Sequence, residues 1–300
     1  MSADPPTTSA AAAQGDWTVR RVLEWTASHL RQHGSECPRL EAEILLAHAR
    51  GCDRIHLYTR YGENLSDAER SVMRELVQRR AKSEPVAHLV GRREFFSLDF
   101  KVSPAVLIPR PDTETLVVEA LERLKQSPTA RVLDIGTGSG CIAISIAVHA
   151  RNCKVTAVDV SPLALEIARD NAETHGVLDR IAFVEGDCLK TLPDHAEFEM
   201  IVSNPPYIRT VEIAGLSPDV QRHEPHLALD GGQDGLDLTR RIIAEAPSRL
   251  VPGGSLLLEI GCDQRADVLE LIAGQTLLEE ARCYRDLAGL DRVVAARRRT

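Results

Sequence analysis

Residues 131–147 constrain the fold of this chain more than any other stretch. The segment Arg131–Ile135 has the composition of a buried parallel strand, and a loop with three alternate glycines follows it at Gly136–Gly140. The apolar run Cys141–Ala147 then continues as a helix. Strand, glycine loop and helix in this order let the backbone approach a ligand closely and aim the free N–H groups of the helix N-terminus at it. The pattern therefore predicts an α/β domain with a nucleotide-type site at this loop.

The spacing of the glycines favours one class of ligand. They give G-x-G-x-G rather than the G-x-G-x-x-G of dinucleotide enzymes, and Asp134 stands two places before the first of them. A second strand, Lys154–Val158, ends at Asp159, about 20 residues past the loop, where an acidic side chain receives a ribose diol. S-adenosylmethionine has a ribose and a zwitterionic tail but no pyrophosphate, so it suits this variant. The alternatives are a dinucleotide-dependent oxidoreductase that binds NAD and a tight turn without any ligand.

Strands and helices continue to alternate along the rest of the chain. Further strands are expected at residues 180–185, 198–202 and 254–260, helices at 162–175 and 238–250, and an antiparallel closing pair at 278–284 and 292–296. Alternation of this kind predicts a mostly parallel sheet with helices on both faces. The first and fourth strands can then be neighbours across a switch point, which would bring the glycine loop and Asn204 to one cleft.

The stretch Asn204-Pro205-Pro206-Tyr207 after the fourth strand has the chemistry to hold a planar NH2 group. The two prolines lack backbone N–H donors, so the strand must stop at Asn204 and leave carbonyls that no sheet claims. The Asn204 side-chain oxygen and a freed carbonyl can accept both hydrogens of an amide or an exocyclic amine, and Tyr207 adds a flat face. We predict that Asn204, Pro205 and Tyr207 are catalytic and that all four residues bind substrate. A strand-ending turn is the alternative interpretation.

The first part of the chain is predicted to be helical. Residues 16–83 carry apolar positions at helical spacing, with Thr18 placed to cap a helix that ends near Gly34 and Ser66 opening a capping-box pattern. A helical module of this size suits a docking role toward something larger than a metabolite. Residues 1–15 are rich in Ala, Ser, Thr and Pro, and we expect them to be a disordered lead-in.

A different pattern separates this module from the α/β domain. Within residues 84–112, two short strands are expected over 94–102 and 105–108, which suggests a hairpin and a linker. Prolines at 109 and 111 make the end of this segment stiff. The α/β domain is then expected to occupy residues 113–300.

Net charge, hydropathy and cysteine usage argue against several classes of function. A formal net charge of −8 argues weakly against a partner bound mainly through phosphates. No apolar stretch approaches the ~20 residues of a membrane span, and the N-terminus lacks the features of a secretory signal. The seven cysteines are scattered and form no C-x-x-C pair, which argues against a disulfide framework and a zinc site. We therefore expect a cytoplasmic protein with no metal and no membrane association.

Together these motifs resemble those of the class I S-adenosylmethionine-dependent methyltransferases that use Asn-Pro-Pro-Tyr to methylate planar nitrogen. More closely, the chain is similar to the PrmC/HemK family, the peptide chain release factor glutamine N-methyltransferases. The resemblance covers nearly all of the chain after residues 1–15. Its motifs stand at Glu84–Leu89, Leu107–Glu114, Val132–Gly140, Val202–Ile208 and Leu229–Leu236. Several long motifs in one order make the match specific.

The resemblance implies a Rossmann-like class I methyltransferase fold over residues 113–300 and a substrate-docking role for the helical domain at 16–83. It implies methylation of the glutamine side-chain amide in the Gly-Gly-Gln motif of class I release factors. We also expect a monomer that does not bind nucleic acid directly. The implied cofactor-binding residues are Gly136, Thr137, Gly138, Ser139, Gly140, Asp159, Cys188 and Asn204. Cys188 stands where family members often have a Trp near the adenine. The alternative is an N6-adenine methyltransferase acting on DNA or RNA, because an exocyclic amine fits the same pair of acceptors.

Overall fold

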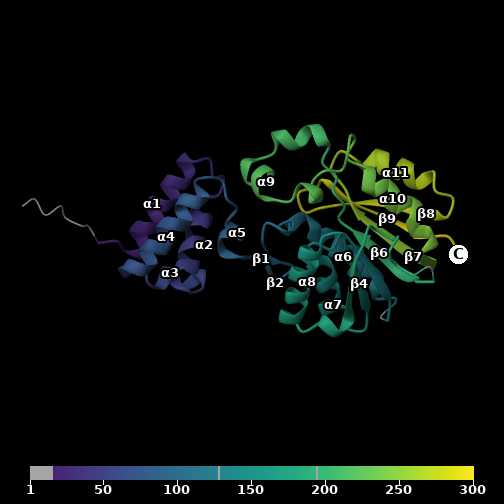
Figure 1. The fold of residues 1–300 in the computed structure, drawn as a ribbon, viewed down its shortest axis with the longest axis horizontal. Helices are drawn as coiled ribbons and strands as arrows, with labels where there is room; N and C mark the ends of the chain where they lie inside the picture. The colour runs from purple at the N-terminus through teal and green to yellow at the C-terminus, as the bar shows by residue number, and fades with distance from the viewer. Residues whose placement is uncertain (1–15, 128, 194) are drawn as a thin grey trace, which may run out of the picture. The chain divides into compact units, whose positions relative to one another are not determined.

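The computed structural model describes residues 16–127, 129–193 and 195–300 (Figure 1). The chain divides into two compact units, with the boundary between Val90 and Gly91. The disordered lead-in expected over residues 1–15 lies outside the described residues. Within the described parts of the chain, none of the helices has both the length and the apolar character needed to cross a lipid bilayer.

The N-terminal unit is built from helices, as predicted. They are α1 (Val19–Gln32), α2 (Pro38–Arg50), α3 (Arg54–Thr59), α4 (Asp67–Arg80) and α5 (Val86–Val90). Thr18 caps α1 by accepting a hydrogen bond from the Arg21 N–H, and Ser66 forms the expected capping box of α4 with Glu69. The apolar faces of these helices pack into a core of their own. The short α5 is not predicted from the sequence, because one turn of helix shows no periodicity.

A β-hairpin opens the second unit, and its position corrects a prediction. The strands are β1 (Arg92–Phe95) and β2 (Leu98–Lys101), which pair antiparallel with Phe95 opposite Leu98. The sequence predicts one strand over residues 94–102 and another over 105–108. Both predictions are wrong, because a turn interrupts the first stretch and the second forms no strand.

The hairpin turn is Phe96-Ser97, and both residues have positive φ, at 50° and 59°. Two-residue hairpin loops need this left-handed conformation, and Gly or Asn usually supplies it. Here a tertiary contact helps to hold the turn, since Glu114 Oε1 accepts the Phe96 N–H at 2.9 Å. A contact between residues so far apart in sequence is invisible to a local pattern.

The second unit contains a seven-stranded sheet within its described residues, in the order β5-β4-β3-β6-β7-β9-β8. Its strands are β3 (Arg131–Ile135), β4 (Lys154–Asp159), β5 (Ile181–Glu185), β6 (Phe198–Ser203), β7 (Leu250–Glu259), β8 (Leu278–Arg285) and β9 (Asp291–Arg298). The first five run parallel, and β9 pairs antiparallel with both β7 and β8. The mostly parallel sheet with an antiparallel closing pair is therefore confirmed.

Helices cover both faces of this sheet (Figure 1). The covering helices are α6 (Glu114–Leu124), α7 (Cys141–His149), α8 (Pro162–Thr174), α10 (Asp237–Glu245) and α11 (Arg265–Ala273), with a 3-10 turn, η1 (Pro111–Thr113), before α6. The short helix α9 (Pro218–His223) lies in the connection between β6 and α10 and places no residue in either core. Consecutive residues of β3 face opposite cores: Val132 packs with α6 and α7, and Leu133 packs with α10 and α11. This is the layered Rossmann-like architecture expected from the sequence.

The region around β7 differs from its prediction at both ends. The helix expected over residues 238–250 ends at Glu245, because Pro247 cannot continue it. The strand begins at Leu250 rather than at residue 254, and a register shift against β6 accommodates the extra residues. The helix α11 is absent from the sequence prediction.

Candidate active site

The strand order brings the two sequence motifs together. β3 and β6 are parallel neighbours, with Ile135 opposite Ser203, so the glycine loop and Asn204 leave the sheet side by side at its carboxyl edge. The Ser203 hydroxyl ties the two strand ends by donating to the Ile135 carbonyl at 2.7 Å. Ligands of open α/β sheets bind at such an edge, beside the point where the strand order reverses. The predicted switch point is confirmed.

A cavity of about 350 Å³ lies at this edge. Six of the predicted site residues line it: Gly136, Gly138, Asp159, Cys188, Asn204 and Pro206. Thr137, Ser139, Gly140, Pro205 and Tyr207 are not among its lining residues. The wall is completed by segments that the sequence analysis did not assign to the site, including Ala105–Leu107 and residues near Pro225, Asp187 and Arg241.

The glycine loop is shaped by its backbone. Gly138 has φ +56°, and a Cβ built on it would meet no heavy atom within 4 Å, so its face is open. The Gly138 N–H donates to Asp159 Oδ2 at 2.8 Å, and the Ser161 N–H donates to Asp159 Oδ1 at 2.9 Å. Burial raises the pKa of Asp159, and these backbone donors partly offset the rise. Gly140 serves packing instead, because a Cβ there would lie 2.8 Å from Ile144 Cδ1.

Thr137 supports the loop from behind. Its hydroxyl donates to Asp134 Oδ2 at 2.7 Å, and both side chains are buried. Burial raises the pKa of Asp134 to about 7, opposed by the hydrogen bonds from Thr137 and from the Ala143 backbone. Ser139 is also buried, and its carbonyl accepts the Asn171 Nδ2 of α8 at 2.9 Å. These residues fix the shape of the loop, and a direct contact between them and a cofactor stays a prediction.

Cys188 lies in the wall of the cavity with its backbone in the left-handed region, at φ 58°. The side chain is buried, and burial raises the pKa of its thiol to about 11, so it stays neutral at physiological pH. Next to it, Asp187 pairs with Arg241 of α10 at 2.8 Å. The expected contact between Cys188 and an adenine remains a prediction.

The Asn204 side chain has a defined partner. Its Nδ2 donates to the Thr113 hydroxyl at the end of η1, at 3.2 Å, which leaves Oδ1 as the free end of the amide. Pro205 is buried beside it. The Tyr207 hydroxyl lies 3.5 Å from Glu259 Oε1, and its carbonyl accepts the Gln264 Nε2 at 3.0 Å. Burial raises the pKa of Tyr207 to about 12.

Sequence reasoning missed Thr113 and Glu259. Glu259 is the last residue of β7 and is only 1% exposed. Burial raises the pKa of Glu259 to about 7, and the nearby Thr113 side chain and the positive charge of Arg292 oppose the rise. An acidic residue at the carboxyl end of a central strand was a usable signal for Glu259. Thr113 lies within the motif at Leu107–Glu114, but nothing in its local pattern distinguishes it from a helix cap.

Two wall segments of the cavity are joined by a buried carboxylate. Glu224 is 4% exposed, accepts the Ile108 N–H at 3.1 Å and forms an ion pair with Arg110. These interactions hold the segment that contains Ala105–Leu107 against the segment that contains Pro225. Part of the predicted linker therefore lines the candidate cavity.

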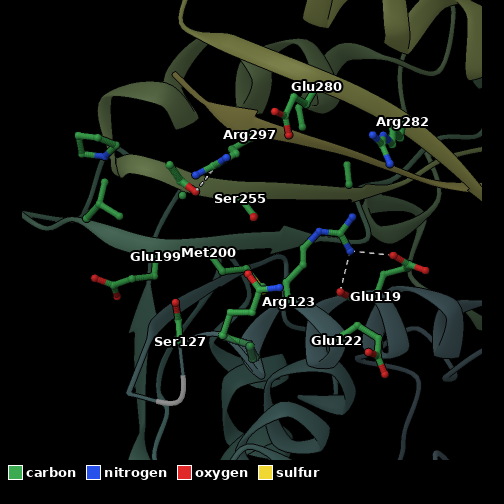
Figure 2. Close-up of a pocket in the computed structure, with 18 of the residues that line it drawn as sticks. Glu119, Glu122, Arg123, Ser127, Glu199, Met200, Ser255, Glu280, Arg282 and Arg297 are labelled. Carbon is green, nitrogen blue, oxygen red and sulfur yellow. Dashed lines mark hydrogen bonds and ion pairs between the residues drawn. The ribbon is translucent and has the colours of Figure 1, made fainter. Parts of the chain in front are cut away.

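A larger cavity of about 730 Å³ lies at the other end of the strands (Figure 2). Its lining includes Glu199 at the start of β6 and none of the predicted site residues. Figure 2 shows two of its arginines already engaged, with Arg123 bonded to Glu119 and Arg297 bonded to the Gly253 carbonyl. Since ligands of parallel sheets bind at the carboxyl ends of the strands, the smaller cavity is the candidate active site.

Comparisons with known proteins identify the family of this chain. Residues 21–91 match the family model of the PrmC N-terminal domain, and residues 111–215 match that of the methyltransferase small domain. The release factor glutamine methyltransferase of Geobacter sulfurreducens is 46% identical over 94% of this chain and 97% of that protein. The protein of the same name from Rhodopirellula baltica is 45% identical over 93% of this chain and 96% of that protein.

A solved structure supports the fold alone. A methyltransferase from Pyrococcus furiosus has a TM-score of 0.50 and 22% identity, and the match covers 69% of this chain and 91% of that one. The near full-length relatives carry the assignment. This chain is an enzyme of the methyltransferase class and belongs to the release factor glutamine methyltransferase family.

Proposed function

We propose that this protein methylates the side-chain amide nitrogen of the glutamine in the Gly-Gly-Gln motif of class I peptide chain release factors, with S-adenosylmethionine as the methyl donor. The observation that carries the proposal is the orientation of Asn204. Its Nδ2 is bound to Thr113, so its acceptor Oδ1 is left to face the cavity that Gly136 and Gly138 also line. The names of the near full-length relatives support the same substrate.

The chain's residues fit the cofactor. Gly136 and Gly138 leave open space where other residues would place a Cβ, so a ligand can lie directly on the backbone. Asp159 offers carboxylate oxygens at the cavity wall, which suit a ribose diol. A volume of about 350 Å³ is in the range of small-molecule sites. When bound, S-adenosylmethionine supplies an electrophilic methyl group on a sulfonium.

The enzyme's own residues make a poor nucleophile react. An amide nitrogen shares its lone pair with the carbonyl, and in our proposal Asn204 Oδ1 and the Pro205 carbonyl accept its two N–H groups. These bonds raise the electron density on the nitrogen and hold its lone pair in line with the methyl group. Asn204 is neutral, so it adds no full charge beside the substrate. The proton that the nitrogen must lose leaves to water afterwards.

The remaining predicted residues complete this proposal. Pro206 lines the cavity, and Tyr207 is held through its carbonyl by Gln264, which fixes the segment after Asn204. The helical domain at residues 16–83 docks the release factor. The protein acts as a cytoplasmic monomer without direct contact to nucleic acid.

The experiment replaces Asn204 with Ala. Methyl transfer to a release factor should fall at least ~100-fold, the usual scale when a polar group that stabilises the reacting centre is removed, while calorimetry shows nearly unchanged binding of S-adenosylmethionine. Asn152→Ala removes an exposed amide between α7 and β4 and serves as the control. Full turnover in Asn204→Ala would remove this residue from the chemistry.

The second candidate is an N6-adenine methyltransferase acting on DNA or RNA. The adenine exocyclic amine presents two hydrogens to the same pair of acceptors. The net charge of −8 disfavours it. Labelled S-adenosylmethionine offered together with a release factor and with oligonucleotides separates the two, because the label enters only the true substrate.

A further inference from the structure

We propose that Thr113 is a positioning residue that sets the orientation of the Asn204 amide, and that Glu259 holds the Thr113 hydroxyl in the required direction. The inference rests on the proposed function and deepens it, because it says what makes the Asn204 oxygen, rather than its NH2 group, face the substrate.

An asparagine amide has two similar ends, and its neighbours decide which end points where. Asn204 Nδ2 donates to Thr113 Oγ1 at 3.2 Å. With the amide turned by 180°, the NH2 group would face the substrate nitrogen, and two sets of donors would oppose each other. A residue that distinguishes the two orientations therefore controls whether the site can hold an amide at all.

The Thr113 hydroxyl is available for this task because it makes no hydrogen bond to the backbone of α6, although the residue stands at the N-cap position. Thr113 is the N-cap of α6, yet its backbone is helical, with φ −63° and ψ −19°, and its side chain makes no capping hydrogen bond. The side chain is 2% exposed, so water does not compete for it. Threonine at this position normally serves the helix. Here the hydroxyl serves Asn204 instead.

A hydroxyl accepts from either side unless its own proton is committed. Glu259 is 1% exposed, and the Thr113 side chain is among the groups that lower the pKa of its carboxyl. One of its oxygens, Oε1, has the long contact with Tyr207, and the other, Oε2, is buried and has no hydrogen-bond partner among the described residues, so it is free to accept a hydrogen bond. An ionised carboxylate only accepts, so it takes the Thr113 proton and turns the hydroxyl lone pairs toward Asn204 Nδ2. We call Glu259, Thr113 and Asn204 the relay.

The charged groups around Glu259 favour this arrangement. Arg292 is 7% exposed, and its positive charge stabilises the ionised carboxylate. Asp112 acts against ionisation, but it forms an ion pair with Arg292 at 3.2 Å. Tyr207 and the thiol of Cys141 are the other titratable groups that interact with this carboxylate. The three residues of the relay come from η1, the end of β6 and the end of β7.

The test compares Thr113→Val, which keeps the shape and loses the hydroxyl, with Thr113→Ser, which keeps the hydroxyl. Thr113→Val should lower kcat about tenfold, the scale of one net hydrogen bond, with unchanged binding of S-adenosylmethionine, and Thr113→Ser should recover most of the loss. Thr174→Val on the exposed face of α8 is the control. Equal activity in Thr113→Val and wild type, or equal loss in the Val and Ser variants, overturns the proposal.

A second readout needs no substrate. The Asn204 side-chain NH2 signals in a nitrogen-15 correlation spectrum, assigned by their loss in Asn204→Ala, should move in Thr113→Val and stay in place in Thr113→Ser. Signals that do not move in Thr113→Val contradict the positioning role. The two proposals can fail separately. If the signals move as expected but the wild-type protein does not methylate release factors, the positioning role is supported and only the proposed function is contradicted.

Discussion

A single buried carboxylate, Glu259, links function and stability at the residue scale. Its pKa in the folded protein is raised to about 7, above the ordinary value for glutamate. Between these two values the folded state holds a proton that the unfolded state has released. Stability attached to this group is therefore present at low pH and is lost as the pH rises toward 7. The ionised form that suits the relay is the form that costs stability.

We predict that Glu259→Gln becomes more stable relative to wild type as the pH rises from 5 to 8. The glutamine variant carries no buried charge at this position at any pH, whereas wild type acquires one over this range. Thermal unfolding of both proteins at several pH values measures the difference. Asp134, whose pKa burial also raises to about 7, is present in both proteins and cancels. A difference that is independent of pH would contradict the prediction.

The residues of the site differ in whether the local sequence predicts them. Gly138, Asp159 and Asn204 are predictable because each belongs to a local pattern whose chemistry is complete within a few residues. Thr113 lies 91 residues before Asn204, and only the assembled fold places the two together. A residue that acts through a neighbour far along the chain leaves no local signal.

At the scale of elements, the unit of strand, loop and helix from β3 to α7 is the part that sequence predicts best. Its hydrophobic strand, glycines and apolar helix all favour the same local structure, so propensity and fold agree. The strands of the β1–β2 hairpin are predicted wrongly because their positions depend on contacts with distant parts of the chain. Asn171 of α8 holds Lys101 by bonds of 2.7 and 3.0 Å to its backbone N–H and carbonyl, and this interaction between distant elements helps to set the hairpin.

Two glycines of one loop should respond differently to substitution by Ala. Gly138→Ala meets open space and should cost only the ~1–2 kcal/mol of a left-handed alanine, while it obstructs the face proposed for S-adenosylmethionine and weakens its binding. Gly140 has φ +81°, and a Cβ added there would lie 2.8 Å from Ile144 and 3.2 Å from Ala168. Gly140→Ala should therefore lose stability through the same backbone strain and through roughly 1–3 kcal/mol of overpacking.

Denaturant unfolding and calorimetry of the two glycine variants provide the measurement. The expected pattern is a larger loss of stability in Gly140→Ala and a loss of affinity in Gly138→Ala that its stability does not explain. Equal losses of both quantities in the two variants would mean that the loop acts as one structural unit.

For the whole molecule, the choice between cofactors is decided by ligand-linked stability. S-adenosylmethionine at a hundred times its Kd should raise the free energy of unfolding by about 2.7 kcal/mol, and NAD at the same concentration should leave it unchanged. A thermal-shift assay with both ligands measures this. A shift with NAD alone would support the oxidoreductase alternative and contradict the proposed cofactor.

The relay among Thr113, Asn204 and Glu259 also bears on how this enzyme comes into being. Its members enter from three separated places in the chain, and the last of them sits on β7, well past both recognisable motifs. A nascent or truncated polypeptide that stops before β7 already contains the glycine loop and Asn-Pro-Pro-Tyr. It lacks Glu259, so the Thr113 hydroxyl is not held in the direction that turns the asparagine oxygen toward the substrate. Catalytic activity should therefore appear late in synthesis, only after β7 has paired with β6.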